Sequence, residues 1–174
     1  SEAMLDLARV HAGGPEELRR LTLPDDPIPE ADAIVGVGHA LNYLDDLEQL
    51  HRALAAIARA LRPGGIMAID RCDLEWGSAR RSEPPKVWRT DDWLLVTQFS
   101  APSPDRYVRD MTTFVRQADG CWRRDDEVHD NVLVNTSTVP ELLAGHGVEA
   151  SVLGSFGDEE LPVGLVAVVG RRRK

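Results

Sequence analysis

The chain has 174 residues, of which 43% are hydrophobic and 28% charged, a composition typical of a folded globular protein rather than a disordered one. Its 20 basic and 29 acidic side chains give a net charge of -9, so it lacks the basic face that nucleic-acid binding needs. Cys72 and Cys121 have no partners at metal-ligand spacing, and no apolar run could span a bilayer, which predicts a cytoplasmic protein without metal or membrane contact.

Helices and strands alternate in the first third of the chain. A helix is expected to begin with Ser1 as its N-cap and to end near Gly13 and Gly14. Arg20–Leu23 suits a short strand before a proline-rich loop. The unbroken apolar run Ala33–Val37 then predicts a strand that is buried on both faces.

An amphipathic helix follows, with Asp45 as the expected N-cap and Glu48 as its capping-box partner. Five apolar residues at steps of three and four predict the face that packs on the sheet: Leu47, Leu50, Leu54, Ile57 and Leu61. Residues 63–65, Pro-Gly-Gly, stop this helix, and Ile66–Ile69 predicts a second buried strand. Strand, helix and strand together indicate a βαβ unit with parallel strands.

Beyond Asp73 the pattern changes to alternating segments that are typical of antiparallel strands. Three such segments, separated by turn sequences, predict a meander: Trp93–Phe99, Tyr107–Arg116 and Trp122–Val134. A short helix is expected to begin around Pro140. Val148–Leu153 and Leu165–Val169 are expected as closing strands, so the chain as a whole predicts an α/β fold.

Polar residues follow each of the two predicted buried strands. Residues 38–43, with the sequence GHALNY, come after the first strand, and Arg71, Cys72 and Asp73 come after the second. In an open α/β sheet, ligands bind outside the carboxyl ends of the strands. We therefore expect a ligand pocket between Gly38 and Asp73, beneath the meander.

Four stretches of the sequence resemble the class I S-adenosylmethionine-dependent methyltransferases, particularly small-molecule members such as the aminosugar N-methyltransferases. The helix start after that family's second strand resembles SEAMLDLAR, and its fourth strand with the following loop resembles ADAIVGVGHALNYL. The junction of helix, turn and fifth strand resembles LRPGGIMAID, which is the most specific of the four. The late region before the last helix and strand resembles HDNVLVNTSTVPELLAGHGVEA.

This resemblance implies a single domain, 1–174, with a partial doubly wound, Rossmann-like methyltransferase sheet from 1–73 and 135–174. It implies that 74–134 is an inserted antiparallel β meander, which covers the acceptor pocket. The activity implied is transfer of a methyl group from S-adenosylmethionine to nitrogen or oxygen of a small-molecule acceptor, leaving S-adenosylhomocysteine. The alternative is a non-catalytic remnant that acts as a binding or assembly module.

The sequence also departs from the family. The glycine-rich first loop, which wraps the methionine end of the cofactor, has no counterpart, and neither has the acid that binds the ribose. The chain is therefore expected to begin after the family's second strand. Ala33–Val37 would then lie at an exposed sheet edge, which tends to recruit another strand. We expect either that Arg20–Leu23 pairs with this edge or that a second chain covers it. A homodimer through this edge follows from the second possibility, and the meander is the alternative dimer interface.

The resemblance implies cofactor contacts for Met4, Asp25, Gly38 and His39. Met4 and Asp25 would lie against the adenine, although a plain helix core and a solvated turn are the competing interpretations. Gly38 allows close approach of the backbone to a ligand. His39 is the candidate catalytic residue, because an imidazole can orient the acceptor or take its proton. A loop histidine satisfied by hydrogen bonds is the alternative.

Four further residues are expected to bind the substrate: Asn42, Tyr43, Asp73 and His129. Asn42 and Tyr43 could line the acceptor pocket or simply close the turn before the long helix. A carboxylate at Asp73 could hold an amine, or could form a surface ion pair instead. His129 and Glu127 share one face of a predicted strand, so an acid–imidazole pair is possible there.

Overall fold

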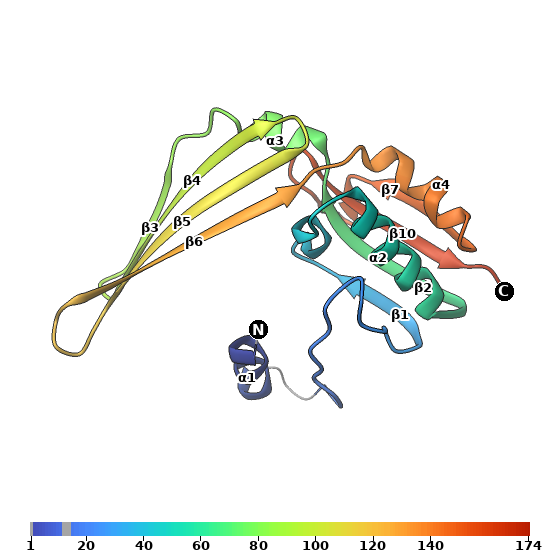
Figure 1. Ribbon diagram of the computed structural model, residues 1–174, viewed down its shortest axis with the longest axis horizontal. Coiled ribbons are helices and arrows are strands. Elements are labelled where there is room, and N and C mark those ends of the chain that lie inside the picture. Colours follow the sequence, from blue (N-terminus) through green and yellow to red (C-terminus); the bar gives the residue numbers. More distant parts are fainter. Residues whose placement is uncertain (1, 12–14) are drawn as a thin grey trace.

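Two four-stranded sheets make up most of the computed structural model, which describes residues 2–11 and 15–174 (Figure 1). The expected N-cap Ser1 and the expected helix end at Gly13 and Gly14 lie outside these residues. One sheet is mixed and carries helices, and the other is a long antiparallel meander that projects away from it (Figure 1). The predicted α/β fold with an antiparallel addition is therefore confirmed.

The mixed sheet contains the predicted parallel pair of strands. Its strands are, in spatial order, β1 (Ala31–Gly36), β2 (Leu61–Cys72), β10 (Leu165–Arg172) and β7 (Val148–Leu153). β1 runs parallel to β2, whereas β10 is antiparallel to both β2 and β7. α2 (Leu47–Ala60) and α4 (Val139–Ala144) lie together on one face of this sheet (Figure 1).

α2 buries its apolar stripe against the sheet, with one exception. Its side chains at Leu50, Leu54 and Ile57, and Leu61 just beyond its end, are at most 3% exposed, as predicted. Leu47, however, is 51% exposed, because it lies in the first turn and borders a surface cleft instead of the sheet. The N-cap is Asp46 rather than Asp45, since the Asp46 carboxylate accepts a hydrogen bond of 2.8 Å from the backbone N–H of Gln49.

The Pro-Gly-Gly turn forms an irregular start to β2. Ala31 pairs with Leu61 but Ala33 pairs with Ile66, so residues 62–65 bulge out of the ladder. Gly64 has a φ of 80°, a left-handed conformation that favours glycine. The chain thereby reverses from α2 into a buried strand within a few residues, and the predicted strand Ile66–Ile69 is the regular part of β2.

The meander contains the three predicted strands and one that sequence patterns missed. Its strands are, in order, β3 (Lys86–Arg89), β4 (Trp93–Ser103), β5 (Arg106–Arg116) and β6 (Trp122–Val132). The short helix α3 (Leu74–Arg80) connects β2 to this sheet. Smaller elements complete the chain: two 3-10 helices (Ala40–Tyr43 and Thr136–Thr138), β8 (Ser155–Phe156) and β9 (Glu159–Glu160).

The predictions for the segment before β1 are partly wrong. Arg20–Leu23 is not a strand and does not pair with β1; instead Leu23 and Ile28 pack against the apolar core. Prolines at 24, 27 and 29 deprive this segment of backbone donors and fix its φ angles, which prevents a regular ladder. β1 is consequently an edge strand, not a doubly buried one, and Val35 is 69% exposed. Cover by a second chain stays a prediction.

The main apolar core lies between α2, α4 and the mixed sheet. A second, smaller cluster joins the two sheets and consists of Cys72, Tyr107 and Leu133. α1 (Glu2–His11) contributes no buried residue and lies apart from both sheets (Figure 1). Within residues 2–11 and 15–174, no helix is both long and apolar enough to cross a membrane.

Candidate functional site

The loop after β1 is anchored by a carboxylate from β2. Because the two strands are parallel, with Gly36 beside Ile69, their carboxyl ends lie at the same edge of the sheet. Asp70, only 6% exposed, accepts hydrogen bonds from the backbone N–H groups of Gly38 (2.9 Å) and His39 (2.6 Å). Sequence reasoning missed Asp70, although a carboxylate at the end of a buried strand is a usable signal.

Both anchored residues have left-handed backbone conformations. Gly38 has a φ of 86°, and His39 has a φ of 46°, which is the one positive φ of a non-glycine residue in the described ranges. A left-handed histidine is strained, so the surrounding structure must hold it there, and the Asp70 carboxylate does so. A Cβ atom at Gly38 would meet no atom within 4 Å, which leaves this backbone open to an incoming group.

Aromatic side chains from three elements meet beside this loop. The His39 ring stacks on Tyr43 with a centroid distance of 5.9 Å and an interplanar angle of 17°. The His39 ring also lies 6.1 Å from Trp76 of α3. Tyr43 in turn meets His129 of β6 edge-on at 5.3 Å. The structure therefore brings together three of the predicted site residues and adds Trp76, which the sequence did not single out.

Trp76 reaches this cluster because Gly164 permits a close approach. The backbone N–H of Asp73 donates a 2.8 Å hydrogen bond to the carbonyl of Gly164, which draws the start of α3 against the loop before β10. A Cβ atom at Gly164 would lie 2.3 Å from the backbone nitrogen of Trp76. The guanidinium of Arg80 lies over the Trp76 ring, 3.2 Å from its centroid.

His129 has close polar neighbours on both ring nitrogens. Its Nδ1 lies 2.5 Å from the Tyr43 hydroxyl and 3.1 Å from Nη2 of Arg109, which stands opposite it on β5. Its Nε2 lies 2.8 Å from a carboxylate oxygen of Glu127. The same-face pair of Glu127 and His129 that the strand pattern predicted is thus observed.

Burial controls the charge of the candidate catalytic histidine. It lowers the pKa of His39 below its ordinary value of 6.5, an effect that nearby Asp70 opposes and Arg109 reinforces. Nδ1 of His39 is buried and has no hydrogen-bond partner. His39 is therefore a neutral imidazole near neutral pH, able to accept or donate one hydrogen bond at the edge of the site.

Asn42 and Asp73 are structural joints in this arrangement. Asn42 is fully buried, and its amide donates to the carbonyls of Cys72 (3.1 Å) and Val132 (2.6 Å) and accepts from the Cys72 N–H (3.0 Å). It therefore ties β2 to the end of β6. The Asp73 carboxylate caps α3 and accepts hydrogen bonds from the backbone and hydroxyl of Thr136. Substrate contacts for these two residues stay predictions.

The remaining predicted cofactor residues lie on the N-terminal part of the chain. Met4 is 64% exposed on α1. Asp25 lies in the turn before β1 and forms an exposed ion pair with Arg52 of α2. This exposed ion pair connects the proline-rich segment to the helix, and cofactor contacts for Met4 and Asp25 stay predictions.

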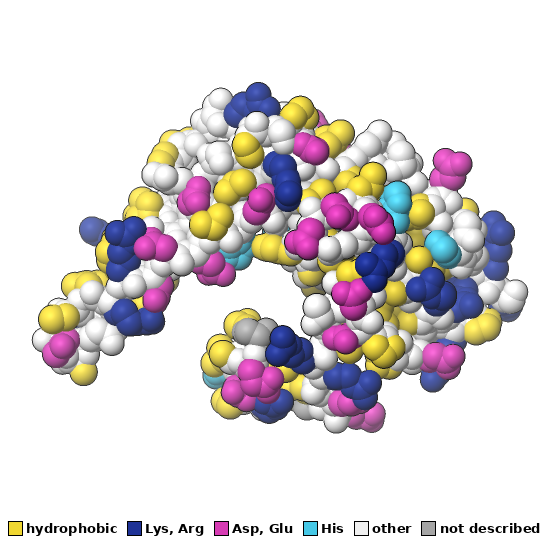
Figure 2. Space-filling model, viewed as in Figure 1, with side chains coloured by type: hydrophobic (Ala, Val, Ile, Leu, Met, Phe, Trp, Pro, Cys, Tyr) yellow, Lys and Arg dark blue, Asp and Glu magenta, His cyan; other side chains and the backbone are white. Residues whose placement is uncertain are grey.

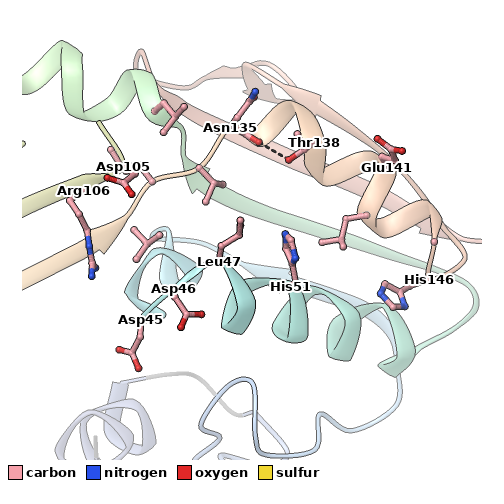
Figure 3. Close-up of a pocket in the computed structure, with 16 residues that line it drawn as sticks. Asp45, Asp46, Leu47, His51, Asp105, Arg106, Asn135, Thr138, Glu141 and His146 are labelled. Carbon is pink, nitrogen blue, oxygen red and sulfur yellow. Dashed lines mark hydrogen bonds between the residues drawn. The ribbon is translucent and has the colours of Figure 1, made fainter. Parts of the chain in front are cut away.

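Two clefts differ in their relation to this site. A cleft of about 240 Å³ adjoins the anchored loop and is lined mostly by apolar residues, with Gly36, Ala40 and Asp70 at its loop side. A larger, open cleft of about 990 Å³ lies between α2 and α4, where His51 and His146 point into it (Figure 3). None of the predicted site residues lines the larger cleft, and a site at the strand ends stays a prediction.

Solved methyltransferase structures share this fold. An S-adenosylmethionine-dependent methyltransferase from Clostridium acetobutylicum ATCC 824 matches with a TM-score of 0.82 and 16% identity, over 100% of this chain and 73% of that one. The sugar N-methyltransferase KedS8 from Streptoalloteichus sp ATCC 53650 matches with a TM-score of 0.67 and 24% identity, over 86% of this chain and 59% of that one. CalS10, an amino pentose methyltransferase from Micromonospora echinaspora, matches with a TM-score of 0.65 and 19% identity, over 99% of this chain and 71% of that one.

Sequence comparison alone finds no such likeness, since no protein-family model and no curated protein matches the chain. At sequence identities below 25%, the structural likeness shows that the fold is shared. It nevertheless extends over both the mixed sheet and the meander, because the match with the Clostridium structure covers the whole chain. The chain has the Rossmann-like fold of the S-adenosylmethionine-dependent methyltransferases.

Proposed function

We propose that the chain is a methyltransferase domain that moves a methyl group from S-adenosylmethionine to nitrogen or oxygen of a small-molecule acceptor. The observation that carries this proposal is the loop of Gly38 and His39, which Asp70 anchors at the carboxyl edge of the parallel strands. Open α/β sheets bind their ligands at this edge. The likeness to solved methyltransferases supports the same interpretation.

The residues present fit part of the cofactor. The apolar cleft beside the loop suits the flat, weakly polar adenine of S-adenosylmethionine. The open backbone of Gly38 allows a ligand to approach, and Met4 and Asp25 are proposed to contact the adenine. When bound, the cofactor supplies a methyl group already activated by its sulfonium. The chain's own task is then to align the acceptor and exclude water.

The acceptor is proposed to bind between the His39 loop and the meander. His39, as a neutral imidazole, offers one hydrogen bond to orient the reacting group. Tyr43 and His129 border the same space, and Trp76 closes it from the α3 side. Asn42 and Asp73 are proposed to support this pocket; they hold the sheets together in the geometry that the pocket needs.

The division into a Rossmann-like part (1–73 and 135–174) and a cover (74–134) belongs to the same proposal. We also propose a cytoplasmic location, which both free cysteines support, because a reducing compartment keeps thiols free. A homodimer through the exposed edge of β1 or through the meander is a further part of the proposal. The exposed Val35 and Val37 support the first of these interfaces.

The same exposed edge favours a second candidate function. An unpaired apolar strand edge is a template for another strand, as in a binding or assembly module without catalysis. The two functions differ in one product. A methyltransferase releases S-adenosylhomocysteine together with a methylated acceptor, whereas an assembly module binds a partner and transfers nothing.

Methyl transfer from labelled S-adenosylmethionine to a panel of small amines and hydroxyl compounds tests the proposal, with mass spectrometry of the acceptors as the readout. We expect labelled product from the chain, a strong loss in His39→Ala and no loss in His51→Ala. His51 is the matched control because it is an exposed histidine of the other cleft. Absence of product from the unaltered chain with every acceptor would favour the assembly module.

A further inference from the structure

The hydrogen-bonded pair of Tyr43 and His129 bridges the two sheets at the proposed acceptor site. Tyr43 belongs to the 3-10 helix that follows β1, and His129 belongs to β6 of the meander. Their 2.5 Å contact joins Tyr43, a residue that is 42% exposed, to the His129 side chain, which is 16% exposed. A short hydrogen bond from an accessible phenol to a shielded imidazole is an arrangement that can move a proton.

The tautomer of His129 follows from its neighbour Arg109. A guanidinium carries only N–H donors and stays protonated in proteins. Since Nη2 of Arg109 lies 3.1 Å from Nδ1 of His129, this nitrogen must present its lone pair. The Tyr43 hydroxyl, 2.5 Å from the same nitrogen, is therefore a donor, and the ring proton of neutral His129 resides on Nε2.

Opposite charges lie on the two sides of the His129 ring. Glu127 places a carboxylate oxygen 2.8 Å from Nε2, close but not aligned for a hydrogen bond, so its attraction is greatest when the ring is charged. Arg109 repels a charged ring, and His39 also interacts with it. Arg109 thus donates to Nδ1 on one side of the ring, and Glu127 lies beside the positive charge that a transferred proton would create on the other.

We propose that Tyr43 is the residue that takes the proton of the acceptor and that His129 acts through it. As the acceptor's N–H or O–H proton moves to the Tyr43 oxygen, the proton of Tyr43 moves to Nδ1 of His129. Tyr43 ends neutral, His129 ends as an imidazolium beside Glu127, and water later removes that proton. His39, whose imidazole burial keeps neutral, orients the acceptor.

This inference rests on the proposed methyl transfer and gives the proton a route. The rival role for the same two residues is a structural one, in which the hydrogen bond only holds the meander against the mixed sheet. The two roles separate in kinetics. A structural clasp changes stability without a special dependence on pH, whereas a relay requires neutral His129 and so produces an acidic limb in the rate profile.

The test compares Tyr43→Phe and His129→Gln with His146→Gln, a matched control in the cleft between α2 and α4. We expect kcat to fall by about 100-fold or more in the first two variants. The acidic limb of the kcat profile should disappear with them, while KM changes little. His146→Gln should keep both kcat and the limb. Tyr43→Phe with an unchanged kcat and an unchanged limb would overturn the relay.

Nitrogen-15 NMR of the histidine rings supplies a second readout that needs no cofactor. We expect His129 in the Nε2–H tautomer with a bare Nδ1, and we expect the Nδ1 signal to shift in Tyr43→Phe. A proton on Nδ1 of neutral His129 would overturn the proposal even if transfer occurs. Absence of methyl transfer by the unaltered chain defeats the proposed function and the relay together, whereas transfer that survives Tyr43→Phe defeats the relay alone.

Discussion

The mixed sheet and the meander are stabilised in different ways. In the mixed sheet, α2 buries Leu50 and Leu54 almost completely against β2 and β10, which gives this half an apolar core. In the meander, the edge strand β6 exposes most of its side chains, and pairs such as Arg124 with Asp126 line its surface. Figure 2 shows mixed charges over this extended part of the molecule. Apolar burial dominates the first half, and strand pairing dominates the second.

This difference explains why the candidate site lies where it does. The meander has little core of its own, so it depends on a few joints with the mixed sheet, namely Asn42 and the cluster around Cys72 and Tyr107. The site residues His39 and His129 come from opposite sides of these joints. The geometry of the site is therefore expected to be more sensitive to the joints than to the core. Four predictions test this comparison.

The largest effect is expected in the core of the mixed sheet. Leu54 is fully buried, so Leu54→Ala should lower the free energy of unfolding by about 2–5 kcal/mol through lost burial and a residual cavity. Leu47→Ala is the matched control on the same helix, and its change should stay within about 0.5 kcal/mol because Leu47 is 51% exposed. Urea melts followed by circular dichroism measure both, and equal losses would refute the contrast.

An effect on stability of similar size, but confined to one part of the molecule, is expected at the joint. Asn42→Ala leaves the N–H and the carbonyl of Cys72 without the partner that Asn42 supplies, at about 1–3 kcal/mol for each unpaired group. The carbonyl of Val132 loses its shorter hydrogen bond and keeps the one from Arg71. The loss should be accompanied by faster hydrogen exchange in β5 and β6 than in β2, since the joint holds the meander. Uniform acceleration in both sheets would show that the two halves do not differ in this way.

The buried histidine gives a dependence of stability on pH. Burial lowers the pKa of His39 below 6.5, so in the range beneath that value the unfolded chain binds a proton that the folded chain refuses. Stability therefore decreases as the pH falls below about 6.5. His39→Asn should reduce this decrease, and Asn tolerates the left-handed backbone at this position. Melting curves recorded at several pH values in this range measure the effect. An identical dependence of stability on pH in the variant and the unaltered chain would contradict the burial of His39.

The smallest perturbation compares one cysteine from each region. Cys72 is buried at the junction, and burial raises the pKa of its thiol to about 12, whereas Cys121 is exposed beside the turn into β6. Because the thiolate is the reactive form, a disulfide reagent should label Cys121 rapidly and Cys72 only after unfolding. In the folded Cys121→Ser variant, Cys72 is the remaining thiol, and the absorbance of the released chromophore measures how fast it is labelled. Rapid labelling of Cys72 would show that the junction between the sheets is open.

Sequence patterns predicted the elements that are periodic or bounded by strong turn residues. The βαβ unit, the three long meander strands and the stripe from Leu50 to Leu61 follow from local spacing, which one sequence displays. The burial of β1 could not be predicted in this way, because it depends on which strand lies beside it. At Arg20–Leu23 the apolar and β-branched residues favoured a strand. The prolines that follow them prevented it, because they lack backbone donors and have fixed φ angles.

The candidate site was predictable in part. His39, Tyr43 and His129 were singled out because polar residues at strand ends and same-face acid–imidazole pairs are visible in sequence; the structure brings them together, and their roles stay predictions. Asp70, Arg109 and Trp76 were missed because their roles arise from contacts across the fold, such as the Asp70 carboxylate reaching the loop after β1. Asn42 is fully buried and connects β2 to the end of β6, a contact that its sequence position did not reveal; its expected place in the pocket stays a prediction.

The most direct test of the central claim is to locate S-adenosylhomocysteine on the chain by NMR titration. The claim is that the cofactor binds at the strand ends, beside the loop that Asp70 anchors. We expect saturable shifts of the backbone amides of Gly38 and His39 and of residues around Asp70, with no shifts at His51 or His146. Shifts centred on the cleft between α2 and α4, or none at millimolar ligand, would contradict the account.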